Sequence, residues 1–156
     1  MFTAIYQVSL EPIPDDEYIT ESDFWDSWFL GRVAEYVDGD VDRNKEIDIL
    51  KSSLESAGLS FGEDEHGDWL IVNSKAEYFK AAFKKFKKQL EILSNFSLED
   101  FSSVSSLDMY YLNKYYDDKQ SVYISADGEM MTLDTFIRRG LVGEKYYIGG
   151  VVGYKG

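Results

Sequence analysis

Residues 2–10 read FTAIYQVSL, and apolar side chains recur at every second position of this run. Ala4, Tyr6 and Val8 fall on one face, which predicts a strand with a buried side. Residues 146–154 form a second strand-like segment near the other end of the chain, and its three internal glycines predict a bulge or an edge position. Both ends of the chain are therefore expected to form strands.

Further strands are expected between these two. Residues 59–61 and 69–72 predict a hairpin joined by the loop Gly-Glu-Asp-Glu-His-Gly. Residues 121–125 predict a strand that leads into the turn Ala-Asp-Gly-Glu at 126–129. Residues 108–116 are rich in tyrosine and fit either a strand or a helix, and we expect a strand.

Residues 20–37 are expected to form the first helix, entered through Thr20 or Ser22. The side chains at helical spacing would form its buried stripe, and these are Trp25, Trp28, Phe29, Val33 and Tyr36. Phe24 and Leu30 lie outside this stripe, so they would be surplus apolar side chains on a second face.

Four more segments favour helices. Residues 45–57 would bury Ile47, Leu50, Leu54 and Ala57 and end at Gly58. Residues 75–93 begin after a capping box of Ser74 and Glu77. One side of that helix would be apolar, with Phe79, Ala82, Phe83, Phe86, Leu90 and Leu93, and the other side would carry Lys80, Lys84, Lys85, Lys87 and Lys88. Residues 97–103 and 132–139 predict short helices, the second closed by Gly140.

The fold class expected from these elements is α+β, with a mostly antiparallel sheet, about three to five helices and a single compact domain over residues 1–156. The 156 residues are 44% hydrophobic, which excludes intrinsic disorder. The chain has no cysteine, so disulfides, thiolate nucleophiles and zinc–thiolate sites are excluded. We find no signal peptide or membrane-spanning run, and therefore expect a cytoplasmic protein without membrane contact.

Catalytic motifs are weak throughout the sequence. His66 is the single histidine, and it falls in an acidic hairpin tip where solvent would surround it. No dinucleotide or phosphate-loop motif occurs, which favours a protein that is not an enzyme. An alternative is a small enzyme or ligand-binding domain whose pocket is walled by the tyrosines at positions 110, 111, 115, 116 and 123.

Residues 40–51 resemble the calcium-binding loop of the EF-hand family. Oxygen-bearing side chains stand at four loop positions, namely Asp40, Asp42, Asn44 and Asp48. Lys45 replaces the glycine needed for the sharp turn, and Lys51 replaces the bidentate glutamate. A degenerate calcium-binding protein is thus a second alternative. The competing interpretation is an ordinary helix connection, with Asp42 or Asn44 as a helix cap and no cofactor.

The charge is divided unevenly along the chain. The whole chain has a formal net charge of −13, but residues 1–73 hold 18 acidic and 4 basic residues, a net of −14. The near-neutral half, residues 74–156, holds 11 acidic and 12 basic residues. This balance argues against direct nucleic-acid binding. It favours an inhibitor or immunity-type protein that imitates nucleic acid and occupies the basic cleft of a partner, such as a nuclease.

The partner-binding residues expected in the acidic half are eight carboxylates with one apolar anchor. They are Asp15, Asp16, Glu17, Asp23, Asp26, Glu35, Asp38 and Asp40, with Phe24 as the anchor. The lysines of residues 75–93 could face this acidic half, either within one chain or across a homodimer.

Overall fold

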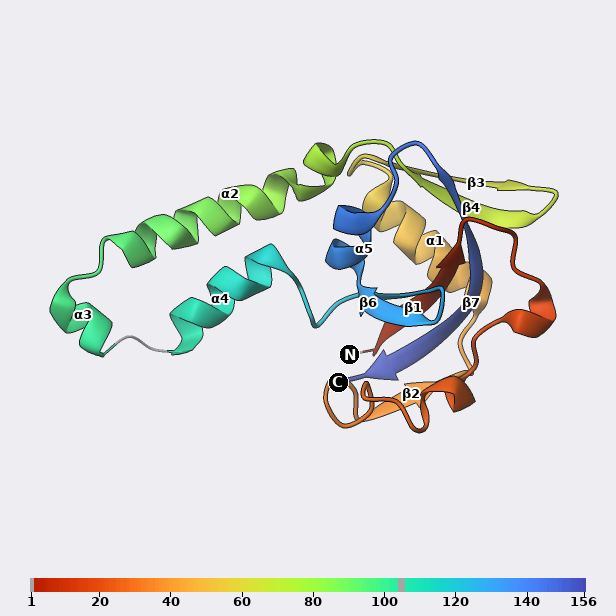
Figure 1. Cartoon of the computed structure of the whole chain (residues 1–156), viewed down its shortest axis with the longest axis horizontal. Helices are drawn as coiled ribbons and strands as arrows, with labels where there is room; N and C mark the ends of the chain where they lie inside the picture. The colour runs from red at the N-terminus through yellow and green to blue at the C-terminus, as the bar shows by residue number, and fades with distance from the viewer. Residues whose placement is uncertain (1, 104–105) are drawn as a thin grey trace.

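The computed structural model describes residues 2–103 and 106–156 and shows an α+β fold (Figure 1). Its strands form one sheet in the order β3-β4-β7-β1-β5-β6, and β2 pairs with β7 beside this path. Only the β1–β5 pair is parallel. The strands are β1 (Phe2–Ser9), β2 (Tyr36–Asp38), β3 (Leu59–Asp64), β4 (Gly67–Val72), β5 (Tyr123–Ala126), β6 (Glu129–Thr132) and β7 (Lys145–Lys155). The predicted fold class is confirmed.

Two helices cover one face of the sheet. They are α1 (Arg43–Leu54) and α5 (Leu133–Arg139), and their buried side chains meet Ala4, Tyr6 and Val8 of β1. Asp42 caps α1 by accepting a hydrogen bond from the Lys45 amide, and Thr132 caps α5 in the same way. The helices predicted at 45–57 and 132–139 are confirmed, because local capping signals and an apolar stripe agree at both places.

An irregular segment covers the other face, where a helix over 20–37 was predicted. That prediction is wrong: the segment has a 3-10 helix, η2 (Glu21–Phe24), then turns, and then β2. Gly31 adopts φ +85°, which a continuing right-handed helix does not allow. The carbonyl of Phe29 accepts the amides of Val33 and Ala34, so the chain reverses and returns to pair with β7.

The predicted burial of Phe29 is confirmed, but the predictions for the other aromatic side chains of this segment are wrong: Phe24 is buried, and Trp25, Trp28 and Tyr36 are exposed. Phe24 and Phe29 are 5% and 0% exposed and pack against Tyr123 and Tyr154 on the sheet. Trp25, which the helical stripe would have buried, is exposed. The need to cover the second face of the sheet decides which side chains are buried here, and helical spacing does not.

The terminal strand β7 occupies a central position, so its predicted place at an edge is wrong. It pairs with β1 on one side and with β4 and β2 on the other. The predicted bulge is confirmed, because the register against β1 shifts between Tyr6 and Val8. A Cβ on Gly149 would lie 2.5 Å from Gln7 Oε1, and one on Gly150 would lie 2.7 Å from the Ile19 carbonyl oxygen. These glycines let residues 13–19 lie directly against the sheet.

Three helices form an arm that extends away from the sheet (Figure 1). They are α2 (Lys75–Ser94), α3 (Leu98–Ser102) and α4 (Ser106–Tyr116). The helices predicted at 75–93 and 97–103 are confirmed, but the strand expected at 108–116 is wrong. Asp108, Leu112 and Tyr115 are the less exposed side chains there, and their spacing is that of one helix face, which lies along α2.

The inner face of α2 is narrower than predicted. Its half-buried and buried side chains, turned toward α4, recur every three or four residues: Phe79, Ala82, Phe86, Gln89 and Leu93. Phe83 and Leu90 were expected on this side but are 59% and 48% exposed. A single neighbouring helix can cover only one stripe of α2, so the remaining apolar side chains stay in solvent.

Contacts with α5 fix the base of the arm. The Arg138 guanidinium lies 4.4 Å from the centre of the Phe79 ring and 4.0 Å from that of Tyr116, and it donates a hydrogen bond to the Tyr116 carbonyl. The Tyr78 hydroxyl donates to Asp134 Oδ1 at 2.6 Å. Burial, together with the Asp134 charge, raises the pKa of Tyr78, so its hydroxyl stays protonated as a donor.

The β3–β4 hairpin is longer than predicted. Its strands run to Asp64 and Gly67 and leave only Glu65 and His66 in the turn. In the part of the chain that the structure describes, no helix combines the length and apolar character needed to cross a membrane.

Candidate functional site

The first group of predicted acidic residues lies on η1 (Asp15–Glu17), a 3-10 helix in which all three carboxylates are exposed. The Gln7 side chain holds this segment in place. Its Nε2 donates to the Glu17 carbonyl at 3.0 Å, and its Oε1 accepts the amides of Ile19 and Gly150 at 3.0 and 2.9 Å. Three hydrogen bonds from one strand residue thus give these acids a fixed backbone.

A second group forms where η2 meets β2. Asp23 Oδ2 accepts the Thr20 amide at 2.7 Å, and Glu21 Oε2 accepts the Gly39 amide at 3.3 Å. Asp38 Oδ1 accepts the Asp40 amide at 2.8 Å. The bond between Glu21 and Gly39 brings η2 beside the end of β2, although the two segments are far apart in sequence. Glu21 is a member that sequence reasoning missed, because the contact with Gly39 depends on the chain reversal.

The two groups are neighbours. Only Tyr18, Ile19 and Thr20 separate η1 from η2, so the Cα atoms of Glu17 and Glu21 lie at most about 14 Å apart. Asp26 follows η2 by two residues, and Glu35 directly precedes β2. All eight predicted carboxylates therefore lie in or beside these two groups.

Few cations balance these carboxylates. Across residues 2–103 and 106–156, none of the eight has a Lys, Arg or His nitrogen within 4.0 Å. The nearby Arg43 is committed elsewhere, because its guanidinium donates to the carbonyls of Ile148 and Gly149 and pairs with Asp68 at 3.0 Å. The acids are thus available to an external cation.

Phe24, the predicted apolar anchor, is buried and points into the core, so its assignment to the exposed surface is wrong. Trp25 and Trp28 are instead 66% and 51% exposed among the acids. The Trp28 ring packs edge-on against Phe29, with 5.9 Å between centroids, so a fully buried residue steadies it. We call Trp25, Trp28, Glu21 and the eight predicted carboxylates the acidic aromatic surface.

The proposed tyrosine-walled pocket does not form as one site. Tyr111 and Tyr115 line an open cavity of about 540 Å³ between the arm and α5, whereas Tyr110 and Tyr116 line another of about 470 Å³. Tyr123 lies in the core. The five tyrosines are therefore divided among three places.

The EF-hand resemblance is also not supported by the backbone. Arg43 to Lys51 lie within α1, so Asn44 and Asp48 are helical residues and not loop ligands. The predicted preceding helix is absent, and Asp42 serves as the cap of α1. No group of three or more His, Asp or Glu side chains in the described ranges is arranged to hold a metal ion.

His66 lies at the tip of the hairpin, exposed as predicted, with Nε2 3.4 Å from Glu65 Oε1. The neighbouring Asp64 accepts hydrogen bonds from Lys145 Nζ and the Tyr147 hydroxyl, both at 2.9 Å. Partial desolvation raises the pKa of Asp64, but these hydrogen bonds and that from the His66 amide outweigh it and lower the pKa to about 2. This cluster is an ion-paired support for the hairpin.

The chain was compared with known proteins at three levels. No family model, no curated protein and no solved structure matches it. The residues of the acidic aromatic surface therefore carry the functional proposal.

Proposed function

We propose that this chain is a non-enzymatic binding protein whose acidic aromatic surface occupies the basic cleft of a partner. The partner class that fits is a nuclease or another nucleic-acid-binding protein, and the effect of binding would be inhibition. The observation that carries the proposal is the exposure of Trp25 and Trp28 close in sequence to carboxylates that, in the described ranges, have no Lys, Arg or His nitrogen within 4.0 Å.

Trp25 and Trp28 supply apolar contact area, which a surface of carboxylates alone lacks. Exposed tryptophan is costly in water, and tryptophan is enriched among the residues that dominate binding energy at interfaces. Because Trp28 rests against the buried Phe29, little side-chain entropy is lost when a partner covers it. We expect Trp25 and Trp28 to provide affinity, and the carboxylates to provide attraction and orientation.

The carboxylates resemble a short piece of phosphate backbone in sign and density. Eight charges within and beside two neighbouring groups produce a local negative field, which accelerates encounter with a basic cleft. A cleft that binds phosphates with lysine and arginine can accept carboxylates in their place. Competition with nucleic acid is the consequence.

The first test is affinity capture with immobilised protein at low salt, followed by elution with salt and mass spectrometry. The variant that tests the acidic aromatic surface is Asp16→Lys/Glu17→Lys/Asp26→Lys/Asp40→Lys. The four wild-type side chains that it replaces are exposed and make no hydrogen bond in the described structure. The control is Asp48→Lys/Glu63→Lys/Glu99→Lys/Glu144→Lys, which replaces exposed acids elsewhere. Both variants shift the net charge from −13 to −5.

We expect a nucleic-acid-binding protein to be retained by the wild type and the control, and lost from the first variant. Labelled duplex DNA bound to that partner should be displaced by the wild type in a fluorescence anisotropy titration. If the two variants retain the same proteins, overall charge explains the binding and the proposed surface is wrong.

A further inference from the structure

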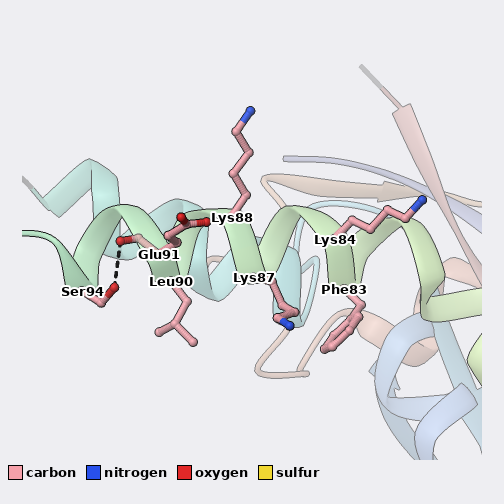
Figure 2. Close-up of a pocket in the computed structure, with 7 residues that line it drawn as sticks. All are labelled: Phe83, Lys84, Lys87, Lys88, Leu90, Glu91 and Ser94. Carbon is pink, nitrogen blue, oxygen red and sulfur yellow. Dashed lines mark hydrogen bonds between the residues drawn. The ribbon is translucent and has the colours of Figure 1, made fainter.

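The outer face of α2 carries a second apolar stripe that nothing in the described structure covers. In Figure 2, Phe83, Lys87 and Leu90 point to one side of the helix, while Lys84 and Lys88 point to the other side in this view. Glu91 lines the same open hollow as these five side chains. Lys87 follows Phe83 by four positions and Leu90 follows Lys87 by three, which places the three side chains along one side of the helix. This face combines exposed apolar groups with cations.

The cations of this face have no anionic partner. In the described ranges, Lys84, Lys87 and Lys88 have no carboxylate oxygen within 4.0 Å. The α2 segment holds six lysines and two glutamates. Close lysines on one helix repel one another, so an anionic occupant would stabilise the face.

Two other occupants fit less well. A second arm would bring lysines against lysines, which like-charge repulsion opposes. An anionic bilayer would meet the tip of the arm, where Glu99 and Asp100 stand between the highly exposed Leu98 and Phe101. The same chain's acidic aromatic surface is out of reach, because the arm extends to the opposite side of the molecule (Figure 1).

We propose that the outer face of α2 docks on the acidic aromatic surface of a second copy of this chain. The two surfaces carry opposite charges, because the α2 face presents lysines and the other surface presents carboxylates. Each also contributes two exposed apolar anchors, Phe83 and Leu90 on the arm and Trp25 and Trp28 on the acidic aromatic surface. If the arm of each copy docks on the acidic aromatic surface of the other copy, the two contacts form a closed two-fold dimer. Self-association then masks the binding surface until a basic partner displaces the arm.

The size of the contact predicts a weak dimer. A 20-residue helix is about 30 Å long and about 10 Å wide, so one docked arm covers about 300 Å². Reciprocal docking makes this about 600 Å² per copy, less than the about 800 Å² per partner of a standard stable interface. A dimer of this kind forms at micromolar or higher concentration, and a tighter partner can compete with it.

The dimer is tested on the protein alone, by sedimentation velocity at about 0.1 M and about 1 M NaCl, where the screening length falls from about 10 Å to about 3 Å. The arm variant is Lys84→Glu/Lys87→Glu/Lys88→Glu, and its control is Lys45→Glu/Lys114→Glu/Lys119→Glu on exposed lysines outside α2. We expect a concentration-dependent dimer at the lower salt that the control keeps. The arm variant and high salt should each weaken association at least about tenfold.

Mixing variants gives the sharpest outcome. The arm variant and the Asp16→Lys/Glu17→Lys/Asp26→Lys/Asp40→Lys variant should each be monomeric, and an equimolar mixture should dimerise, because both contacts again join opposite charges. A wild type that stays monomeric at the lower salt, or variants that do not restore association when mixed, would overturn the dimer. Flotation with phosphatidylserine vesicles by an otherwise monomeric wild type would assign the arm to lipid instead.

The masking role rests on the proposed function, but the dimer does not. If the dimer forms and no basic partner is captured, the proposed function fails alone. If a partner is captured and the wild type is monomeric, only the dimer fails. Where both hold, the arm variant should bind the partner more tightly than the wild type, because nothing competes for the surface.

Discussion

Two segments rich in aromatic residues, 20–37 and the arm, differ in the regularity of their backbone and in the burial of their aromatic side chains. Residues 20–37 contain an irregular chain that buries Phe24 and Phe29 deeply against the sheet. The arm contains the longest regular helix, yet it leaves Phe83 and Leu90 in solvent. Helical pattern and burial are therefore separate properties here, and neither predicts the other.

The difference follows from what each segment lies against. Residues 20–37 cover the second face of the sheet, which gives Phe24, Phe29 and Ala34 a surface to contact but leaves Trp25 and Trp28 exposed. Beyond its base, which α5 holds, α2 packs against α4, so one stripe of α2 is covered and another is exposed.

The largest effect on stability is expected from comparing two substitutions of phenylalanine by alanine, one in each segment. Phe29→Ala removes a ring with no exposed area that touches Tyr123 and Tyr154 edge-on, with centroids 4.9 and 5.0 Å away. The free energy of unfolding should fall by about 3–5 kcal/mol. Phe83→Ala should change it by less than about 0.5 kcal/mol. Urea titration measures both, and equal losses would contradict the assigned burial.

A second test loosens the arm without touching the sheet. Arg138→Met removes the guanidinium between the Phe79 and Tyr116 rings and its hydrogen bond to the Tyr116 carbonyl. We expect the opening free energy of α2 amides to fall by about 2 kcal/mol in hydrogen exchange. Amides of β1 and β7 should keep their protection.

The neighbouring arginine supplies the control for this test. Arg139→Met removes an exposed cation that pairs only with Glu129 at 3.1 Å. Its effect on the arm should be near zero. Equal loss of protection in both variants would mean that overall charge, and not the clamp of Arg138, holds the arm.

A smaller effect is expected at the start of α2. The Ser74 hydroxyl accepts the Glu77 amide at 3.2 Å, so Ser74→Ala should destabilise the helix by about 1 kcal/mol. The loss should appear in the helical circular dichroism signal at lower denaturant than the loss of the sheet. Ser74→Asp, which keeps a cap, should restore it.

The smallest expected effect concerns Asp64, which accepts hydrogen bonds from both Lys145 and Tyr147. The pKa of Asp64 is lowered from 3.8 to about 2, so its contribution to stability is complete above about pH 4 and is lost as pH falls through about 2. Asp64→Asn removes that contribution at every pH. The wild type and Asp64→Asn should therefore differ in unfolding free energy at about pH 5 and converge toward about pH 2.

An exposed, unpaired acid provides the comparison for that titration. Asp48→Asn should track the wild type at all pH values, because Asp48 makes no ion pair in the described structure. If the difference in unfolding free energy between the wild type and Asp64→Asn does not narrow as the pH falls, Lys145 does not lower the pKa of Asp64 in solution.

Local signals predicted much of the fold from sequence. The alternation in 2–10 identified β1, Ser74 marked the start of α2, and Thr132 and Gly140 bounded α5. These signals act between residues close in sequence, so no knowledge of the tertiary structure was needed. The mostly antiparallel sheet followed from the hairpins.

Nonlocal packing explains what sequence reasoning missed. The apolar side chains of 20–37 do recur at helical spacing, but Gly31 breaks the helix and the second face of the sheet is covered by apolar side chains. As a result Phe24 is buried and Trp25 is exposed, which is the reverse of the prediction. A glycine directly after Leu30 was the available signal for a break in that helix. The contact between Glu21 and Gly39 had no sequence signal at all.

The most direct test compares two pairs of exposed apolar residues for binding to the captured basic partner. Isothermal titration calorimetry of Trp25→Ala/Trp28→Ala should show an affinity at least about 100-fold weaker than that of the wild type. Phe83→Ala/Leu90→Ala, which removes a similar pair from the arm, should bind no more weakly than the wild type. Wild-type affinity in the tryptophan variant, with its fold intact by circular dichroism, would contradict the acidic aromatic surface as the binding site.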